Sequence, residues 1–328
     1  MFAEAIEEIL KDQCTPAAVR AIEAGETPAR LWSAVADAGY LELLAPEEAG
    51  GAGLPLAELF PILTTLGRYA APLPLAQSIA ARSLLSHASD IPAGMLTFAP
   101  ALRRMADGRL VCPAVPFGAL AEYVLAEDAG GLLLLDCVDA LRTPTGVHGS
   151  QVATLAWNAD SPGRRLAGAG AELATFSAAL YAALLAGAMQ RVFDMTLQYA
   201  NDRSQFGKSI GKFQAIQHQI SVMAEHVAAA SIAAEAAFQS DTGRPAALAA
   251  AIAKSRASEA AQLVASTAHA VHGAIGITEE YDLQLFTRRL HDWRMAHGSE
   301  MHWDLIIGRA VLDSEAPTVT DFVHALGA

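Results

Sequence analysis

The sequence is poor in charged residues, in aromatic residues and in cysteine. Only 17% of its 328 residues are charged and 6% are aromatic, whereas 53% are hydrophobic. A chain this apolar buries enough surface to offset the entropy of folding, so a disordered protein is excluded, and its length allows two or three units of about 100–200 residues each. The three cysteines, Cys14, Cys112 and Cys137, form no CxxC pair. Neither a disulfide framework nor a metal site is indicated, and a reducing cytoplasm is the expected location.

Positive charge is also scarce. The chain has 22 Lys and Arg against 35 Asp and Glu, which gives a formal net charge of −13. Nucleic acid is therefore not an expected partner, because phosphate backbones require clustered cations. Two local basic islands stand out against this acidic background, and each is compatible with an anionic small ligand or with ordinary solvated helix ends. The first island contains Arg203, Lys208 and Lys212, and the second contains Arg288, Arg289 and Arg294.

Long hydrophobic runs and a targeting segment are missing as well. The first residues, MFAEAIEEILKDQ, carry acids where a signal peptide needs a basic region. The longest apolar stretch, Ala178–Met189, is shorter than the roughly 20 residues that cross a bilayer. We therefore expect a buried helix there and no membrane span.

The spacing of apolar residues divides the chain into helical, strand-rich and helical parts. Residues 1–90 show helical spacing, residues 91–168 contain short apolar runs between turn-forming residues, and residues 169–328 return to long helical patterns. The helices expected are Leu31–Ala38, Leu56–Leu66, Ala76–Leu85, Leu173–Asn201, Phe213–Ser240, Ala246–Val271, Asp282–Arg294 and Glu300–Val311. The runs expected as strands are Leu110–Val115, Tyr123–Ala126, Leu132–Val138 and Gln151–Ala156, in a region with room for five or six. The predicted fold is α+β, with a small middle β domain and a C-terminal four-helix bundle.

The segment RSQFGKSIGKFQAIQH, residues 203–218, lies where one long helix ends and the next begins. The Arg203 guanidinium and the first backbone N–H groups of the second helix would converge on an anion there. The tripeptide Gly207-Lys208-Ser209 is not part of a P-loop, because Asp202 stands where that loop requires glycine and no strand precedes it.

Taken as a whole, this segment resembles the R-x-Q-F-G-x-x-I-x-x-F-Q-x-I-Q-H signature of the acyl-CoA dehydrogenase family. Three further segments resemble the family in order and spacing: GYLELLAPEEAGGAGLPLAE (39–58), LGRYAAP (66–72) and HGAIGITE (272–279). The resemblance covers both helical parts. It implies FAD as cofactor, an acyl-CoA as substrate, and electron-transferring flavoprotein as the usual electron acceptor.

In that family a carboxylate removes the α proton of the thioester while the flavin accepts hydride from the β carbon. The flavin ring lies in the β domain of one subunit, and the R-x-Q-F-G segment of its neighbour holds the ADP part. The cofactor-binding positions implied here are Arg203, Gln205, Phe206, Phe213, Gln214, Gly273 and Ala274. Arg203 would pair with the pyrophosphate, supported by Gln205 and Phe206. Phe213 and Gln214 would line the adenine side, and Gly273 would permit a close approach of the neighbouring loop.

The sequence departs from the family at the catalytic base. One of the two positions that hold the family's glutamate is His297 here, and the other is Ser177. His297, with an ordinary pKa near 6.5, and Glu300, three positions further on, are the candidates for a base, and an ordinary structural role for His297 is the alternative.

The middle region lacks the family's flavin-facing segments and is shortened. This combination resembles the smaller, degenerate subunit of heterotetrameric (α2β2) bacterial acyl-CoA dehydrogenases of steroid side-chain catabolism. The resemblance implies a chain that clamps the ADP part of FAD for an unlike partner subunit. A complete homotetrameric enzyme with an unusual base and a flavin-free scaffold protein are the alternatives.

Overall fold

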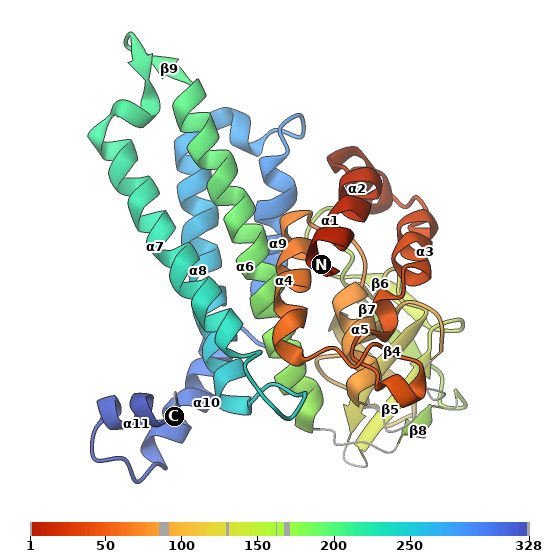
Figure 1. Cartoon of the computed structure of the whole chain (residues 1–328). Helices are drawn as coiled ribbons and strands as arrows, with labels where there is room; N and C mark the ends of the chain where they lie inside the picture. Colours follow the sequence, from red (N-terminus) through yellow and green to blue (C-terminus); the bar gives the residue numbers. More distant parts are fainter. Residues whose placement is uncertain (1, 85–91, 129–130, 162, 167–170, 327–328) are drawn as a thin grey trace.

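The computed structural model describes residues 2–84, 92–128, 131–161, 163–166 and 171–326. It has the α–β–α order expected from the sequence, and the N-terminal helices and the strands lie on the same side of a long C-terminal bundle (Figure 1). The N-terminal helices are α1 (Phe2–Gln13), α2 (Pro16–Glu23), α3 (Ala29–Asp37), α4 (Leu56–Arg68) and α5 (Leu75–Leu84).

Local signals place the ends of these helices. The Thr15 hydroxyl accepts a hydrogen bond from the backbone N–H of Ala18, and Pro16 occupies the first turn of α2, where no N–H is needed. Between α3 and α4 the chain forms only two short 3₁₀ turns, Tyr40–Glu42 and Glu47–Ala49. Gly50 ends the second turn with φ = +82°, a conformation that glycine adopts without steric cost.

The middle region is a sandwich of two four-stranded sheets. Its strands are β1 (Leu96–Phe98), β2 (Arg103–Arg104), β3 (Leu110–Val115), β4 (Tyr123–Asp128), β5 (Gly131–Asp136), β6 (Leu141–Pro144), β7 (Ala153–Trp157) and β8 (Arg164–Leu166). The sheet orders are β1-β4-β5-β8 and β2-β3-β7-β6. The buried side chains of Cys112, Val124, Leu133 and Trp157 belong to one hydrophobic cluster of this sandwich.

The expected number of five or six strands was wrong, because eight form in the described residues from 96 to 166. All four apolar runs named from the sequence became strands, namely β3, β4, β5 and β7. The four missed strands have two to four residues, and β2, β6 and β8 contain arginine. Such segments carry no apolar run, and it is hydrogen bonding to longer neighbours that makes them strands.

The C-terminal bundle is built around one central helix. Its helices are α6 (Ala171–Asp202), α7 (Gln214–Ala236), α8 (Ala247–His272), α9 (Leu283–Met295), α10 (Glu300–Leu312) and α11 (Val319–Leu326). Helix α6 contacts α4, α7, α8 and α9. The five long helices expected from the sequence in this part form within a few residues of their expected ends, whereas α11 was not anticipated.

Helix α6 is longer than its apolar run alone indicated. By length and composition the helix Glu172–Asp202 is able to cross a membrane. The expectation from the sequence considered only the apolar run Ala178–Met189, which is shorter than this helix. However, 83% of its most apolar window is buried inside the protein. Burial on this scale is typical of a core helix, which is the role the sequence predicted for it.

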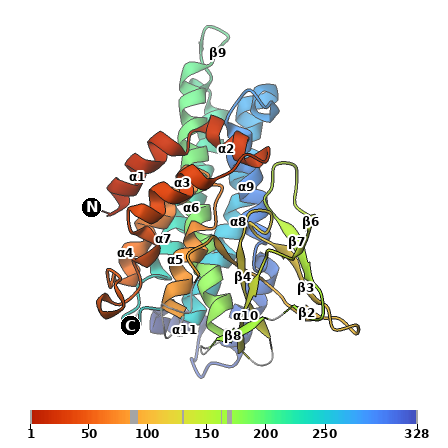
Figure 2. The same cartoon turned by 90° about the vertical axis from the view of Figure 1, so that its right-hand side faces the viewer.

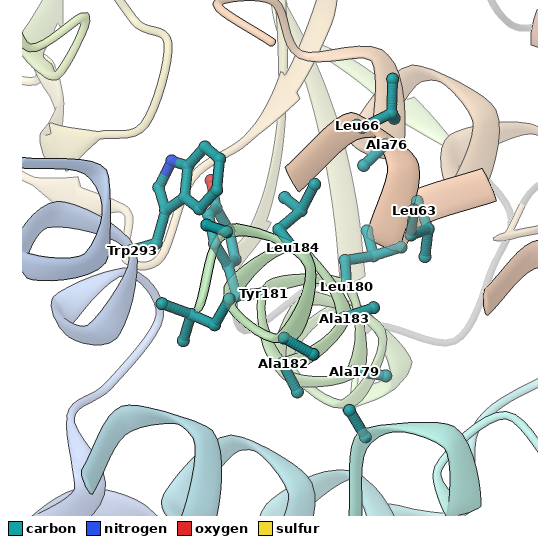
Figure 3. Close-up of a cluster of buried hydrophobic side chains, with 14 of the residues drawn as sticks. Leu63, Leu66, Ala76, Ala179, Leu180, Tyr181, Ala182, Ala183, Leu184 and Trp293 are labelled. Carbon is teal, nitrogen blue, oxygen red and sulfur yellow. The ribbon is translucent and has the colours of Figure 1, made fainter. Parts of the chain in front are cut away.

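Two glycines bring the backbones of α4 and α6 into contact. A Cβ atom at Gly187 would lie 1.9 Å from the carbonyl oxygen of Thr64, and one at Gly67 would lie 2.2 Å from that of Leu184. No side chain fits at either position. This crossing fixes the N-terminal helices against the bundle, and Figure 3 shows Leu63 and Leu66 of α4 beside Leu180 and Leu184 of α6.

Candidate functional site

A short hairpin projects from the end of the bundle between α6 and α7 (Figures 1 and 2). Strands β9 (Ser204–Gln205) and β10 (Lys208–Ser209) pair antiparallel, and Phe206 and Gly207 form the two-residue turn. Both turn residues have positive φ, +50° and +80°. Two positive φ values match a type I′ turn, which aligns with the twist of the strands but is strained for a bulky residue such as phenylalanine.

The cations of the first basic island are exposed around this hairpin. Within the described chain the Arg203 guanidinium has no ion pair and no hydrogen bond to another residue. The Lys208 ammonium lies 4.3 Å from the ring centre of Phe213, and the Phe206 and Phe213 rings meet edge to face at 6.2 Å. Phe206 is 92% exposed. The hairpin therefore presents free positive charge and an aromatic face to the outside.

These side chains border an open hollow of about 730 Å³ at this end of the bundle. It is lined by Tyr199, Arg203, Gln205, Phe206, Ile210, Phe213, Ile216 and the run 270–275. Six of the seven positions implied by the resemblance are thus brought together: Arg203, Gln205, Phe206, Phe213, Gly273 and Ala274. The exception is Gln214, an exposed residue at the first position of α7 that does not line the hollow.

Gly273 ends α8 and also lines the hollow. Its φ of +65° and ψ of −142° are accessible to glycine alone. A Cβ atom there would meet nothing within 4 Å, so within the described chain Gly273 is required by backbone conformation and not by a close neighbour. The preceding His272 stacks on Tyr199 with ring centres 4.4 Å apart, and burial lowers its pKa. The hollow is thus lined by the Arg203 guanidinium and, one turn before it on α6, by the Tyr199 ring stacked on His272.

The second basic island is not available to a ligand. Glu23 of α2 forms ion pairs with Arg288 at 2.7 Å and Arg289 at 2.5 Å, and Arg294 pairs with Glu300. These three arginines share two carboxylates, one far away in the sequence and one on the next helix. At this island the structure therefore shows neither an open phosphate site nor solvated helix ends, the two alternatives that the sequence left open.

His297 is buried, which changes its chemistry. It is 9% exposed, its ring stacks on Tyr181 at 5.6 Å, and its backbone has φ = +54°. Burial, and then the nearby Lys254 ammonium, lower its pKa to about 3. A group this weakly basic is poorly matched to proton abstraction near neutral pH, so the buried position favours the structural role for His297 that the sequence left as the alternative.

Glu300, the second candidate, belongs to a local charge cluster. It pairs with Arg294, and it also faces the buried Lys254. Lys254 donates hydrogen bonds to the Ser258 hydroxyl at 2.8 Å and to the carbonyl oxygens of Arg294 at 2.8 Å and Gly298 at 3.0 Å. Burial lowers the Lys254 pKa to about 7. These contacts hold the turn between α9 and α10, so the geometry indicates a structural role for Glu300.

Tyr181 fills the interior beside His297. It is fully buried on α6, and its hydroxyl accepts a hydrogen bond from the Gln77 amide at 3.0 Å. Figure 3 shows it between Trp293 and Leu184 within the hydrophobic core. Ser177, one turn earlier, is also fully buried and bonds back to the Leu173 carbonyl at 2.7 Å. Both positions at which the resemblance places a base thus lie in packed core.

The sequence did not indicate that Lys254 and Tyr181 lie near His297, or that Tyr199 lines the hollow. A lysine inside the alanine-rich pattern of α8 was the one available signal, because a charged residue at an apolar helical position requires buried partners. The two tyrosines carried no such signal, since aromatic residues are ordinary core components.

Two family models match the sequence. The acyl-CoA dehydrogenase N-terminal domain matches residues 1–91, and the acyl-CoA dehydrogenase C-terminal domain matches residues 171–312. The acyl-CoA dehydrogenase IpdE2 of Mycolicibacterium smegmatis is 33% identical over 302 residues, which cover 89% of this chain and 91% of the relative.

Solved structures agree with these matches. The ChsE4-ChsE5 complex from Mycobacterium tuberculosis contains a chain that superimposes with a TM-score of 0.84 at 26% identity, covering 96% of this chain and 97% of that one. The Tcur3481-Tcur3483 steroid ACAD superimposes with a TM-score of 0.80 at 25% identity, covering 95% and 96%.

Proposed function

Because the chain belongs to the acyl-CoA dehydrogenase family, we propose that it is one subunit of a heteromeric, FAD-dependent acyl-CoA dehydrogenase. In this proposal it clamps the ADP part of FAD for an unlike partner subunit, which houses the flavin ring and the catalytic base. In an α2β2 assembly each FAD would lie between one chain of each kind.

One contrast within the chain carries this proposal. The hollow at the end of the bundle gathers the cationic and aromatic side chains that suit an ADP group, and it is open. The two positions at which the family holds its base are buried here, because the His297 ring stacks on Tyr181 and Ser177 is fully buried. The chain is thus equipped to bind part of a cofactor without being equipped to deprotonate a substrate.

The residues of the hollow fit the ADP part of FAD. Arg203 lines the hollow and provides unpaired positive charge for the pyrophosphate, whereas Lys208, whose ammonium lies over Phe213, and the N-terminus of α7 follow it in the chain. Phe206 and Phe213 offer aromatic faces to the adenine side, and the Gln205 amide supplies polar contacts. FAD supplies the acceptor for the hydride of acyl-CoA oxidation when it is bound.

The space between the β sandwich and α9 of this chain is small. The cavity there, lined by Phe117, Gly149, Arg289 and Trp293 among others, has a volume of only about 30 Å³. The ring is therefore better placed in the partner, whose substrate cavity would take the acyl-CoA.

The names of the relatives point to a substrate class. One similar structure is described as a steroid ACAD, and both solved complexes contain two differently named chains. We extend this to a steroid side-chain CoA ester as the substrate, with electron-transferring flavoprotein as the electron acceptor and the cytoplasm as the location.

The test is to purify the chain alone and together with the product of a neighbouring acyl-CoA dehydrogenase-like gene. Flavin absorbance and ferrocenium reduction by acyl-CoA are then measured for both preparations. We expect little FAD and no turnover for the chain alone, and about one FAD per unlike pair with turnover for the complex. Full FAD occupancy and turnover of the chain alone would favour the homotetramer with an unusual base, and a flavin-free complex would favour the scaffold.

A further inference from the structure

A second cavity lies where the N-terminal helices meet the bundle. It has a volume of about 200 Å³, and its lining comes from α1, α2, the end of α4, α6 and α9. Arg20 of α2 pairs with Asp282 at the start of α9 at 2.6 Å, and Figure 2 shows α2 beside α9. None of the residues that line this cavity lines the hollow at the β9–β10 hairpin. The cavity is therefore separate from the candidate cofactor site.

The floor of this cavity, by which we mean its buried lining residues, is apolar. It includes Cys14, Val19, Ala70, Leu285 and Phe286, each of which is at most 5% exposed. Burial raises the pKa of the Cys14 thiol to about 12, so this side chain stays neutral and behaves as a small apolar group near neutral pH. An apolar cavity of about 150 Å³ is large enough to bind benzene. The floor therefore suits the body of a small aromatic or branched ligand.

The rim of the cavity is polar. Its exposed residues include Lys11, Thr15 and Arg191. The Arg191 guanidinium carbon lies 5.9 Å from the centre of the Phe286 ring, which places the cation beside the aromatic part of the floor. The Thr15 hydroxyl accepts the Ala18 N–H, and its own hydrogen has no acceptor in the part of the chain that the structure describes. The rim thus presents hydrogen-bond donors next to an apolar floor.

The charge that stays unpaired at the rim is positive. The Lys11 ammonium lies 2.7 Å from the Glu8 carboxylate. The Arg68 guanidinium lies 3.2 Å from the Asp194 carboxylate. Arg191, in contrast, has neither an ion pair nor a hydrogen bond among the described residues. A guanidinium without a partner binds a carboxylate through two parallel hydrogen bonds, so the rim favours an anionic ligand of this kind.

The size of the cavity sets a limit on the ligand. Sites for drug-sized molecules have volumes of about 300–1,000 Å³, and this cavity is smaller. Its volume therefore points to a small ligand and not to one of the size of an acyl-CoA or of FAD. A bare inorganic anion would use the rim and leave the apolar floor without a contact. A carboxylate on a compact apolar body uses both.

We propose that this cavity binds a small monocarboxylate with an aromatic or branched apolar body. The carboxylate lies at the rim, where Arg191 donates hydrogen bonds to it, and the apolar body covers Val19 of α2 and Phe286 of α9. Because these residues belong to different parts of the fold, the bound ligand holds the N-terminal helices against the bundle. The site does not depend on the proposed function, since it shares no residue with the hollow.

The test titrates para-fluorobenzoate into the purified chain and follows the ligand by fluorine NMR. We expect saturable binding that Arg191→Gln weakens at least about tenfold, which is the loss expected for a charge-assisted contact. Arg191→Lys keeps the charge and should lose less affinity. Arg203→Gln is the matched control, because Arg203 is also exposed and unpaired within the described chain, and it should change the Kd less than about twofold. The ligand should raise the melting temperature of the wild type and not that of Arg191→Gln.

The neutral analogue para-fluorobenzamide tests the requirement for an anion, and it should bind the wild type at least about tenfold more weakly. Absence of saturable para-fluorobenzoate binding by the wild type would overturn the inference. Equal Kd values for the two analogues, or an unchanged Kd in Arg191→Gln, would overturn it as well. Loss of binding in Arg203→Gln alone would place the carboxylate in the hollow and reject this cavity. None of these outcomes decides whether the complex retains FAD, so the proposed function is tested separately.

Discussion

At the scale of single residues, burial decides which ionisable groups take part in chemistry. His297 and Lys254 lie in the same packed region between α6, α8 and α9, and burial lowers the pKa of each, to about 3 and about 7. In contrast, Arg203 is exposed and unpaired within the described chain. The position of each residue along the motif was visible in the sequence, but its burial was not, because burial depends on residues such as Tyr181, more than 100 positions away from His297.

His297 should make the folded protein sensitive to acid. The unfolded chain protonates this residue below its ordinary pKa of 6.5, whereas the folded protein does so only near pH 3. The contribution of His297 to the free energy of unfolding is therefore lost as the pH falls from 6.5 toward 3, by up to about 1.4 kcal/mol per pH unit. His297→Asn removes the titration and tolerates the positive φ, so its free energy of unfolding should fall less steeply with decreasing pH than that of the wild type.

Urea unfolding between pH 4.5 and 7.5 measures this difference. His218→Asn, on the exposed surface of α7, is the control and should run parallel to the wild type. If the His297→Asn and wild-type curves are parallel as well, the residue is not held neutral by burial.

At the scale of secondary structure elements, the hairpin accepts a strained residue at its tip. A left-handed conformation costs about 1–2 kcal/mol for a residue other than glycine, and Phe206 adopts it at φ = +50°. Asn-Gly is the sequence that best suits this turn. A phenylalanine here is therefore better explained by what its ring contacts than by the stability of the hairpin.

Phe206→Asn tests this explanation. The melting temperature of the isolated chain should stay the same or rise, because the turn loses strain. FAD retention by the complex should fall about fivefold, since an aromatic contact contributes about 1 kcal/mol. Phe206→Tyr keeps the ring and should retain FAD like the wild type. Equal FAD dissociation rates for the wild type and Phe206→Asn would show that the ring does not contact the cofactor.

The crossing of α4 and α6 gives a second prediction at this scale. Gly187→Ala places a Cβ atom against the Thr64 carbonyl, so the helices must separate, and we expect a loss of at least about 3 kcal/mol of unfolding free energy. Gly308→Ala, also inside a helix but facing open space, should gain about 0.5–1 kcal/mol in the isolated chain. Chemical unfolding measures both changes. A change below 1 kcal/mol for Gly187→Ala would mean that the two backbones are not in contact.

At the scale of the whole molecule, the sequence predicted the order of the parts and the place of the segment 203–218 between two long helices of the bundle. Apolar periodicity was enough for the long helices, and the strands with apolar runs were found as well. The sequence did not predict the strands that contain arginine, or the pairing of Arg288 and Arg289 with Glu23, because these interactions join segments that meet only in the folded chain. The hollow combines both cases, since the segments 203–218 and 272–279 were visible as motifs and Tyr199, which stacks on His272, was not.

The most direct test of the account is the affinity of FAD for the complex when this chain carries Arg203→Ala. FAD bound per unlike pair is measured by flavin absorbance during dialysis against increasing volumes of buffer. Loss of a charge-assisted contact should weaken binding by about 1.5–3 kcal/mol, which is roughly 10- to 150-fold. Arg30→Ala, whose side chain is 83% exposed on α3, should bind FAD like the wild type. Unchanged FAD binding by Arg203→Ala, in a complex that still assembles, would contradict the claim that this chain clamps the cofactor.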